Sequence, residues 1–140
     1  MSWARRWVKE TAASTLENTL IDTWADTGIR LAGGAGITAT DLVLRNSTGT
    51  YTGGIYRSAD SEATLIDSTI GGNSTEHASY AGGVALAGDA ASITLDNVDF
   101  IDNVSVDAPA DLSHSFGEHE VLGLGYSGTC VKSVGCTAAE

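Results

Sequence analysis

Basic residues are scarce in this sequence, and long apolar runs are missing altogether. Its 140 residues carry 7 Lys and Arg against 18 Asp and Glu, which gives a net charge of −11. Such a chain lacks the basic surface that neutralises phosphates, so we expect no nucleic acid partner. No apolar run is long enough for a membrane-crossing helix, so no transmembrane segment is expected. The apolar stretch of a signal peptide is not visible either.

Proline and glutamine are almost absent, whereas small residues are abundant. The sequence has one Pro and no Gln, but 17 Gly, 16 Thr and 14 Ser. Since 42% of the residues are hydrophobic, the chain is not a disordered tail. A length of 140 residues fits one domain with a modest core. The composition indicates many short strands joined by tight turns.

The two cysteines, Cys130 and Cys136, lie close together near the C-terminus. In an oxidising compartment this spacing favours a small disulfide-closed loop, whereas a reducing compartment would leave two thiols. A lone pair of cysteines at this spacing is a poor zinc site. We therefore predict a disulfide between Cys130 and Cys136 in a C-terminal tail, residues 127–140.

Internal repeats decide the fold prediction. Four segments share the pattern (Thr/Val)-Leu-x-(Asn/Asp), and they begin at Thr15, Val43, Thr64 and Thr94. Their leucines are 28, 21 and 30 residues apart, which is the size of a solenoid turn with loops of variable length. A second landmark follows the first three segments, since short apolar stretches led by glycine begin at Gly28, Gly54 and Gly83.

A parallel β-coil explains this pattern. Each strand is too short to bury a face alone, but successive turns stack about 4.8 Å apart and bury one continuous column. We predict an interior ladder formed by Leu16, Leu44, Leu65 and Leu95. A second wall would stack Ile29, Ile55 and Val84. Because Asn and Asp tolerate left-handed backbone, we predict a corner formed by Asn18, Asn46, Asp67 and Asn97.

A sandwich of antiparallel hairpins is the alternative all-β fold. It would use Asn-Gly or Asp-Gly turns, and the sequence contains neither. We therefore predict that residues 14–126 form a parallel β-helix of about four turns. Three Asn-x-Ser/Thr sequons, at Asn46, Asn73 and Asn103, are interpreted as structural rather than as glycosylation sites.

Two Gly-Gly-x-x motifs and one Phe-x-x-Asn motif recur within the repeat. They lie at Gly53–Tyr56, Gly82–Ala85 and Phe100–Asn103, with a degenerate copy at Ile70–Asn73. These motifs resemble the repeat of the polymorphic outer-membrane proteins and related surface proteins, and the resemblance covers roughly residues 14 to 125. It implies a right-handed parallel β-helix and an extracellular, often adhesive role.

A solenoid exposes two open ends, and each must be covered. Residues 1–13 have helical periodicity, with Trp3 and Trp7 among charged residues. We expect a short N-terminal amphipathic helical cap there, and a docking segment for another subunit or domain is the alternative. The C-terminal tail offers few apolar residues, so we also expect self-association or a longer parent chain.

Catalytic motifs are missing from the sequence. It contains no Gly-x-Ser-x-Gly elbow and no convincing triad, so we assign no catalytic residue and no cofactor. The densest ligand-like cluster consists of Asp111, His114, Glu118 and His119. Two histidines and two carboxylates could hold a divalent cation. Their spacing matches no defined motif, and a solvated external loop is the alternative interpretation.

Parallel β-helices also include polysaccharide-degrading enzymes of the pectate-lyase type. The active sites of such enzymes are grooves lined with several carboxylates and, in the lyases, an Arg or Lys. Candidates for such a groove are Asp96, Asp99, Asp102, Arg30, Arg45 and Arg57. A solvated outer wall accounts for the carboxylates equally well.

We therefore favour a non-catalytic extracellular or cell-surface module for adhesion, surface display or assembly. Its partner would be a host-surface or extracellular glycan or protein. A small carbohydrate-binding or polysaccharide-degrading β-helix is the alternative.

Overall fold

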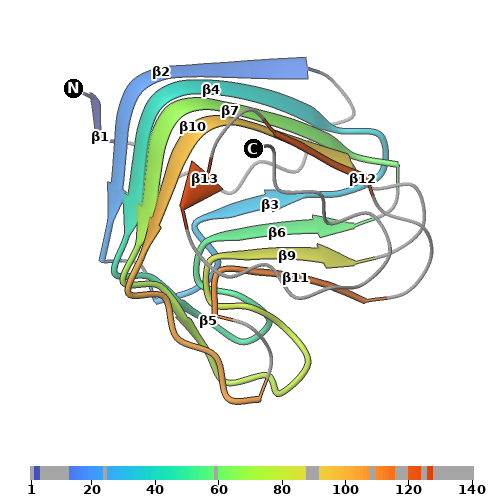
Figure 1. The fold of residues 1–140 in the computed structure, drawn as a ribbon. Coiled ribbons are helices and arrows are strands. Elements are labelled where there is room, and N and C mark those ends of the chain that lie inside the picture. Colours follow the sequence, from blue (N-terminus) through green and yellow to red (C-terminus); the bar gives the residue numbers. More distant parts are fainter. Residues whose placement is uncertain are drawn as a thin grey trace.

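Four long strands form one wall of the molecule and bend around one of its corners (Figure 1). The structure, a computed structural model, describes residues 2–3, 13–23, 25–58, 60–87, 92–107, 110–115, 120–123 and 126–127. The long strands are β2 (Ala13–Asp22), β4 (Gly36–Arg45), β7 (Glu62–Gly71) and β10 (Ser92–Ile101). Three short strands extend their sheet: β1 (Ser2–Trp3), β12 (Glu120–Gly123) and β13 (Tyr126–Ser127).

Two smaller sheets form the other walls. One consists of β3 (Ile29–Leu31), β6 (Ile55–Ser58), β9 (Val84–Ala87) and β11 (Leu112–Ser115). The other consists of β5 (Thr48–Gly49) and β8 (Ser74–Thr75), and a parallel bridge joins it to Val104. All pairings between the described strands are parallel, and each sheet takes its strands from successive turns. The fold is therefore a parallel β-solenoid of about four turns, as the repeat predicts.

The register between the long strands differs from the predicted one at Leu44. One buried column contains Leu16, Ala39, Leu65 and Leu95, and the next contains Ile21, Leu44, Ile70 and Phe100. Leu44 therefore lies in the neighbouring column, and Ala39 occupies the position that we assigned to it. The second wall stacks Ile29, Ile55 and Val84 as predicted, with Leu112 as a fourth member.

Two corners of the coil have left-handed backbone. We call the corner within the long strands the first corner and the corner at their ends the second corner, and their similarity explains why Asn46 is wrongly placed in the prediction. The corner within the long strands stacks Asn18, Asp41, Asp67 and Asn97, and the corner at their ends stacks Thr23, Asn46, Gly72 and Asp102. All eight residues have φ between 46° and 64°, a region that Asn, Asp and Gly tolerate best. Asn46 therefore belongs to the second corner, and Asp41 takes the place that we predicted for it in the first.

Buried asparagines next to the second corner bind successive turns together. Asn73 Oδ1 accepts the backbone N–H of Ser47 at 3.0 Å, and Asn103 Oδ1 accepts that of Asn73 at 3.1 Å. The Nδ2 groups of these asparagines donate to the carbonyls of Leu44 and Ile70 in the preceding turns. Asn73 and Asn103 are buried, so these two sequons are structural in the folded chain.

The ends of the predicted domain layout are described only in part. Within the predicted helical cap, residues 1–13, Ser2 and Trp3 form strand β1 and pair in parallel with Thr19 and Leu20 of β2. The helical cap is therefore not supported, because the open edge of β2 provides these residues with backbone hydrogen bonds that only an extended chain can make. Residues 4–12 and the tail from residue 128 lie outside the described residues.

Within the described ranges, no helix is long and apolar enough to cross a membrane.

Candidate functional site

The outward face of the second sheet carries an irregular row of side chains. Strands β3, β6, β9 and β11 place Arg30, Tyr56, Ala85 and Ser113 in register, one from each turn. Residues of a strand alternate between its two faces, and the neighbouring inward row is aliphatic in all four turns. The outward row therefore contains a cation, an aromatic ring and two small residues, whereas the inward row contains an aliphatic side chain in every turn.

Two loops bring further rings onto this row. Tyr51 precedes β6, and its ring centroid lies 5.4 Å from that of Tyr56 and 5.5 Å from that of His77. Tyr80 packs edge-on against Tyr56 with centroids 6.0 Å apart, and it covers Ala85 and Ala87 of β9. These distances are typical of interacting aromatic pairs. Tyr51, Tyr56, His77 and Tyr80 thus form a continuous surface, which we call the aromatic cluster.

The loop that supplies His77 and Tyr80 is fixed to the turns on both sides of it. Thr75 Oγ1 accepts the backbone N–H of His77 at 3.1 Å and donates to the carbonyl of Tyr51 at 2.7 Å. Ser105 Oγ donates to the carbonyl of Tyr80 at 2.8 Å. The backbone that carries these rings is therefore held by hydrogen bonds within the chain. A surface ordered in this way lowers the entropic cost of binding a ligand.

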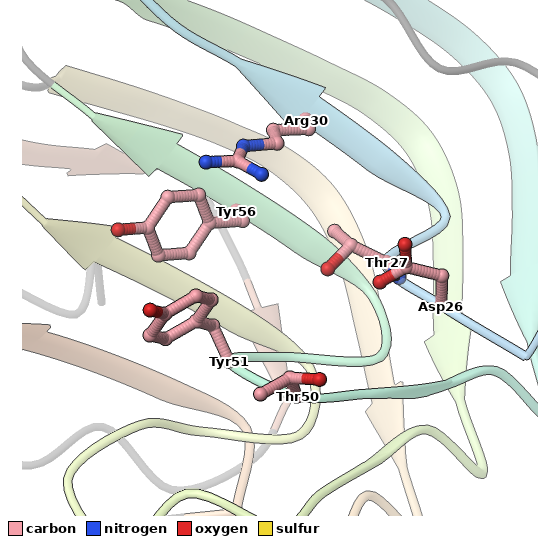
Figure 2. Close-up of a pocket in the computed structure, with 6 residues that line it drawn as sticks. All are labelled: Asp26, Thr27, Arg30, Thr50, Tyr51 and Tyr56. Atoms are coloured by element: carbon pink, nitrogen blue, oxygen red, sulfur yellow. The ribbon is translucent and has the colours of Figure 1, made fainter.

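An open pocket of about 200 Å³ adjoins the aromatic cluster. It is lined by Asp26, Thr27, Arg30, Thr50, Tyr51 and Tyr56, as Figure 2 shows. The guanidinium carbon of Arg30 lies 5.4 Å from the centroid of the Tyr56 ring, within the range of a cation–π interaction. Tyr51 is 42% exposed, so one large ring of the pocket is open to solvent.

Hydrogen bonds hold the polar rim of this pocket. Asp26 Oδ1 accepts the backbone N–H of Thr27 at 2.7 Å, and Thr27 Oγ1 donates to the carbonyl of Thr52 at 2.7 Å. Desolvation raises the pKa of Tyr56, with Tyr80 adding to the effect and Arg30 opposing it. The Tyr56 hydroxyl therefore stays protonated at neutral pH, and it can donate a hydrogen bond. The pocket thus offers ring faces, hydroxyls, one carboxylate and one guanidinium.

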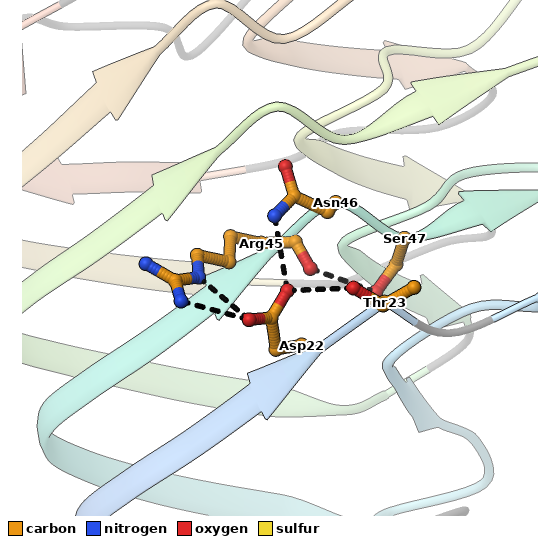
Figure 3. Close-up of polar contacts among 5 residues, drawn as sticks. All are labelled: Asp22, Thr23, Arg45, Asn46 and Ser47. Atoms are coloured by element: carbon orange, nitrogen blue, oxygen red, sulfur yellow. Dashed lines mark hydrogen bonds and ion pairs between the residues drawn. The ribbon is translucent and has the colours of Figure 1, made fainter.

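The other two candidate arginines have structural roles. Arg45 forms an ion pair with Asp22 of the adjacent turn at 2.8 Å, and Asn46 and Thr23 also donate to this carboxylate (Figure 3). The hydrogen bonds from Arg45, Asn46 and Thr23 lower the pKa of Asp22 to about 2. This network connects the first and second turns at the second corner.

Arg57 points into the coil instead of into a groove. It stands in register between Leu31 and Leu86 and is fully buried. Its Nη2 donates to Ser61 Oγ at 3.1 Å, while Nε and Nη1 have no hydrogen-bond partner among the described residues. Burial lowers its pKa to about 10, and the negative charge of Glu62 opposes this shift.

The three candidate carboxylates of β10 do not join the pocket. Asp96, Asp99 and Asp102 lie on β10 and at its end, and none of them lines the pocket. The structure therefore does not bring the acidic and basic candidates together into one groove.

The predicted metal cluster is described only in part. Asp111 is buried, and its Oδ1 accepts a hydrogen bond from Asn103 Nδ2 at 3.0 Å, so it belongs to the asparagine network. His114 lies in β11, whereas Glu118 and His119 lie outside the described residues. Within the described part of the chain, no group of three or more His, Cys, Asp and Glu could hold a metal ion. Cys130 and Cys136 also lie outside it, so their disulfide stays a prediction.

Sequence reasoning missed the aromatic cluster. Tyr51, Tyr56 and Tyr80 share no motif, and loops of different length bring them together. One signal was available. Once the Gly-led strands are aligned, the outward position changes from Arg30 to Tyr56 to Ala85, and such a break in a repeat indicates a position that the fold does not specify.

Comparison of the chain with protein-family models, curated proteins and solved structures gives no match.

Proposed function

We propose that the chain is a non-catalytic, extracellular β-solenoid module of the adhesive or surface-display type, and that it binds a glycan at the aromatic cluster. The observation that carries the proposal is the exposed ring of Tyr51 beside Tyr56, at the edge of a pocket that also contains Arg30 and Asp26. A sugar ring presents an apolar C–H face and a rim of hydroxyls, and this pocket offers a partner for each.

The composition of the pocket supports binding rather than cleavage. Glycoside hydrolysis usually needs two carboxylates on opposite sides of the scissile bond, about 5 to 10 Å apart. Asp26 is the one carboxylate among the residues that line the pocket. The rings and loops are positioned by hydrogen bonds within the chain, so they suit a preformed binding surface.

The winding of the coil and its family resemblance belong to the same proposal. A Cβ added at Gly54 would meet the carbonyl of Gly83, and one at Gly53 or Gly82 would meet other backbone carbonyls. The Gly-Gly motifs therefore permit close stacking of turns, and the asparagines of the two x-x-Asn motifs join them. On the resemblance of these motifs to the polymorphic outer-membrane protein repeat, we propose that the coil is a right-handed β-helix of that type and that it is extracellular.

Binding to a glycan array tests the function. We expect the intact chain to retain a subset of glycans and to leave their bonds intact, as judged by mass spectrometry of the eluted sugars. Tyr51→Ala should abolish retention, whereas the matched control Thr38→Ala, at an exposed position of β4, should not change it. Retention of no glycan by the intact chain, or release of shorter sugars, would contradict the proposal.

Assembly through an open end is the second part of the proposal. Ile101, Val104 and Val106, on the fourth turn, are 48%, 58% and 58% exposed. Strands β12 and β13 pair with β10, whereas no described strand pairs with Val104 beyond the third turn. Exposed apolar side chains at this open edge favour stacking on another solenoid end. We expect light scattering to show association at high concentration, and Val104→Ser with Val106→Ser should reduce it. A chain that stays monomeric at every concentration would contradict this part.

A further inference from the structure

Arg30 differs from the other arginines whose side chains the structure describes. Arg45 is neutralised by the carboxylate of Asp22, and Arg57 is enclosed in the interior. Arg30 is exposed, and no described residue forms an ion pair with it. Its guanidinium instead rests over the Tyr56 ring and faces the pocket, as Figure 2 shows.

The absence of an ion-pair partner for Arg30 among the described residues is informative because carboxylates are abundant. The chain has 18 acidic residues against 7 basic ones, and one of the acidic residues, Asp26, lines the same pocket. Asp26 is engaged by the backbone N–H of Thr27, and it does not pair with Arg30. The pocket therefore keeps a cation and an anion apart, and the rings of Tyr51 and Tyr56 belong to the same lining.

We infer that the sugar bound at this pocket carries a carboxylate, which pairs with Arg30. This inference rests on the proposed glycan binding and specifies its ligand class. The guanidinium can bind a carboxylate through two parallel hydrogen bonds. The sugar ring then stacks against Tyr51 and Tyr56, and its hydroxyls reach Asp26 and Thr50.

The position of Asp26 fixes the orientation of the ligand. A carboxylate turned toward Asp26 would be repelled, whereas a sugar hydroxyl there donates a hydrogen bond. The net charge of −11 does not prevent binding, because the charges of distant exposed residues are screened beyond about 8 Å at physiological salt. The contact with Arg30 is direct and is screened less.

Matched pairs of ligands test the inference and distinguish two sources of the carboxylate. The first pair is a galacturonate trisaccharide and its methyl ester, and the second is sialyllactose and lactose. Isothermal titration should show that one acidic sugar binds at least tenfold more tightly than its neutral partner. Which pair shows the preference identifies a uronic acid or a sialic acid as the ligand.

Two variants assign the preference to Arg30. Arg30→Gln should remove the preference and leave the weak affinity for the neutral sugar. The control Arg45→Gln, at an exposed arginine outside the pocket, should keep the preference. Thermal melting of both variants establishes that they are folded.

The outcomes separate this inference from the proposed function. Equal binding of acidic and neutral sugars, or a preference that survives in Arg30→Gln, would overturn the carboxylate while glycan binding stands. An array on which the intact chain retains only neutral glycans would do the same. Retention of no glycan of either class would overturn both proposals.

Discussion

The two faces of one sheet follow different rules in this molecule. The inward row of β3, β6, β9 and β11 contains Ile29, Ile55, Val84 and Leu112, and every member is fully or almost fully buried. The outward row, one residue later on each strand, contains Arg30, Tyr56, Ala85 and Ser113. Both rows have the same backbone, register and strand spacing. Only the inward row repeats.

This difference separates what the fold requires from what it leaves open. The inward row of Ile29, Ile55, Val84 and Leu112 is enclosed between stacked turns, so packing constrains it to apolar side chains of similar size. Other interior columns tolerate an exception, namely the smaller Ala39 in one and the buried Arg57 in another. The outward row is constrained by what it contacts outside the coil. We therefore interpret repetition in the inward row as a requirement of the fold, and the exposed break at Arg30 and Tyr56 as support for the proposed binding surface.

The largest expected effect comes from the stacking of turns at the Gly-Gly motifs. Gly54→Ala would place a Cβ against the carbonyl of Gly83 in the next turn. The added Cβ is attached directly to the backbone of one turn, and the carbonyl that it meets is backbone of the next turn. Neither atom can move unless the two turns separate, so we expect the free energy of unfolding to fall by at least about 3 kcal/mol. Urea denaturation measures it. The control Gly36→Ala has no atom closer than 3.9 Å and should unfold like the parent.

The second effect tests the inward columns. Leu65 is fully buried, and its neighbours in the column are Ala39 and Leu95. Leu65→Ala should cost about 2 to 5 kcal/mol, since it removes buried methyl groups and leaves a cavity. The same denaturation series checks this value. A midpoint unchanged from the parent would show that Leu65 does not belong to an interior column.

A substitution in the aromatic cluster should affect glycan retention strongly and the stability of the fold only weakly. Tyr51→Ala removes a ring that is 42% exposed, so we expect less than about 1 kcal/mol of lost stability. Its effect on glycan retention should nevertheless be complete. If instead it unfolded the chain as strongly as Leu65→Ala, the aromatic cluster would be part of the core and the distinction between the two faces would fail.

The smallest effect concerns the Asp22 network at the second corner. The pKa of Asp22 is lowered from 3.8 to about 2, so its contribution to stability is present above the unfolded value and is lost as the pH falls toward 2. Asp22→Asn should therefore reduce stability at neutral pH and flatten the melting temperature between pH 4 and pH 2. Thermal melts across this range measure the difference, and parallel curves for parent and variant would contradict it.

The sequence repeat is sufficient to predict the parallel coil, but not its register. Both left-handed corners accept Asn and Asp, and they lie five residues apart in each turn, the first within the long strand and the second just after it, as Asp41 and Asn46 show. An alignment of the repeats can therefore match Asn46 to the wrong corner. That match is attractive because it also places a leucine, Leu44, in the column where the structure has the smaller Ala39.

The pocket beside the aromatic cluster could not be predicted from a motif. Its residues come from two turns, and the cluster beside it adds His77 and Tyr80 from a third. The lengths of the loops determine whether these side chains meet, and loop conformation is not encoded by the hydrophobic pattern that defines the strands. The carboxylates of β10 form the more regular pattern in the sequence, although they lie outside the pocket.

Hydrogen exchange in the presence of the retained glycan tests the central claim most directly, because it reports where along the chain the ligand is bound. We predict added protection of backbone amides in residues 26–30, 50–56 and 76–80, with no change in β2, β4 or β7. Protection confined to the long strands, or none at all with the glycan bound, would contradict the assignment of binding to the aromatic cluster.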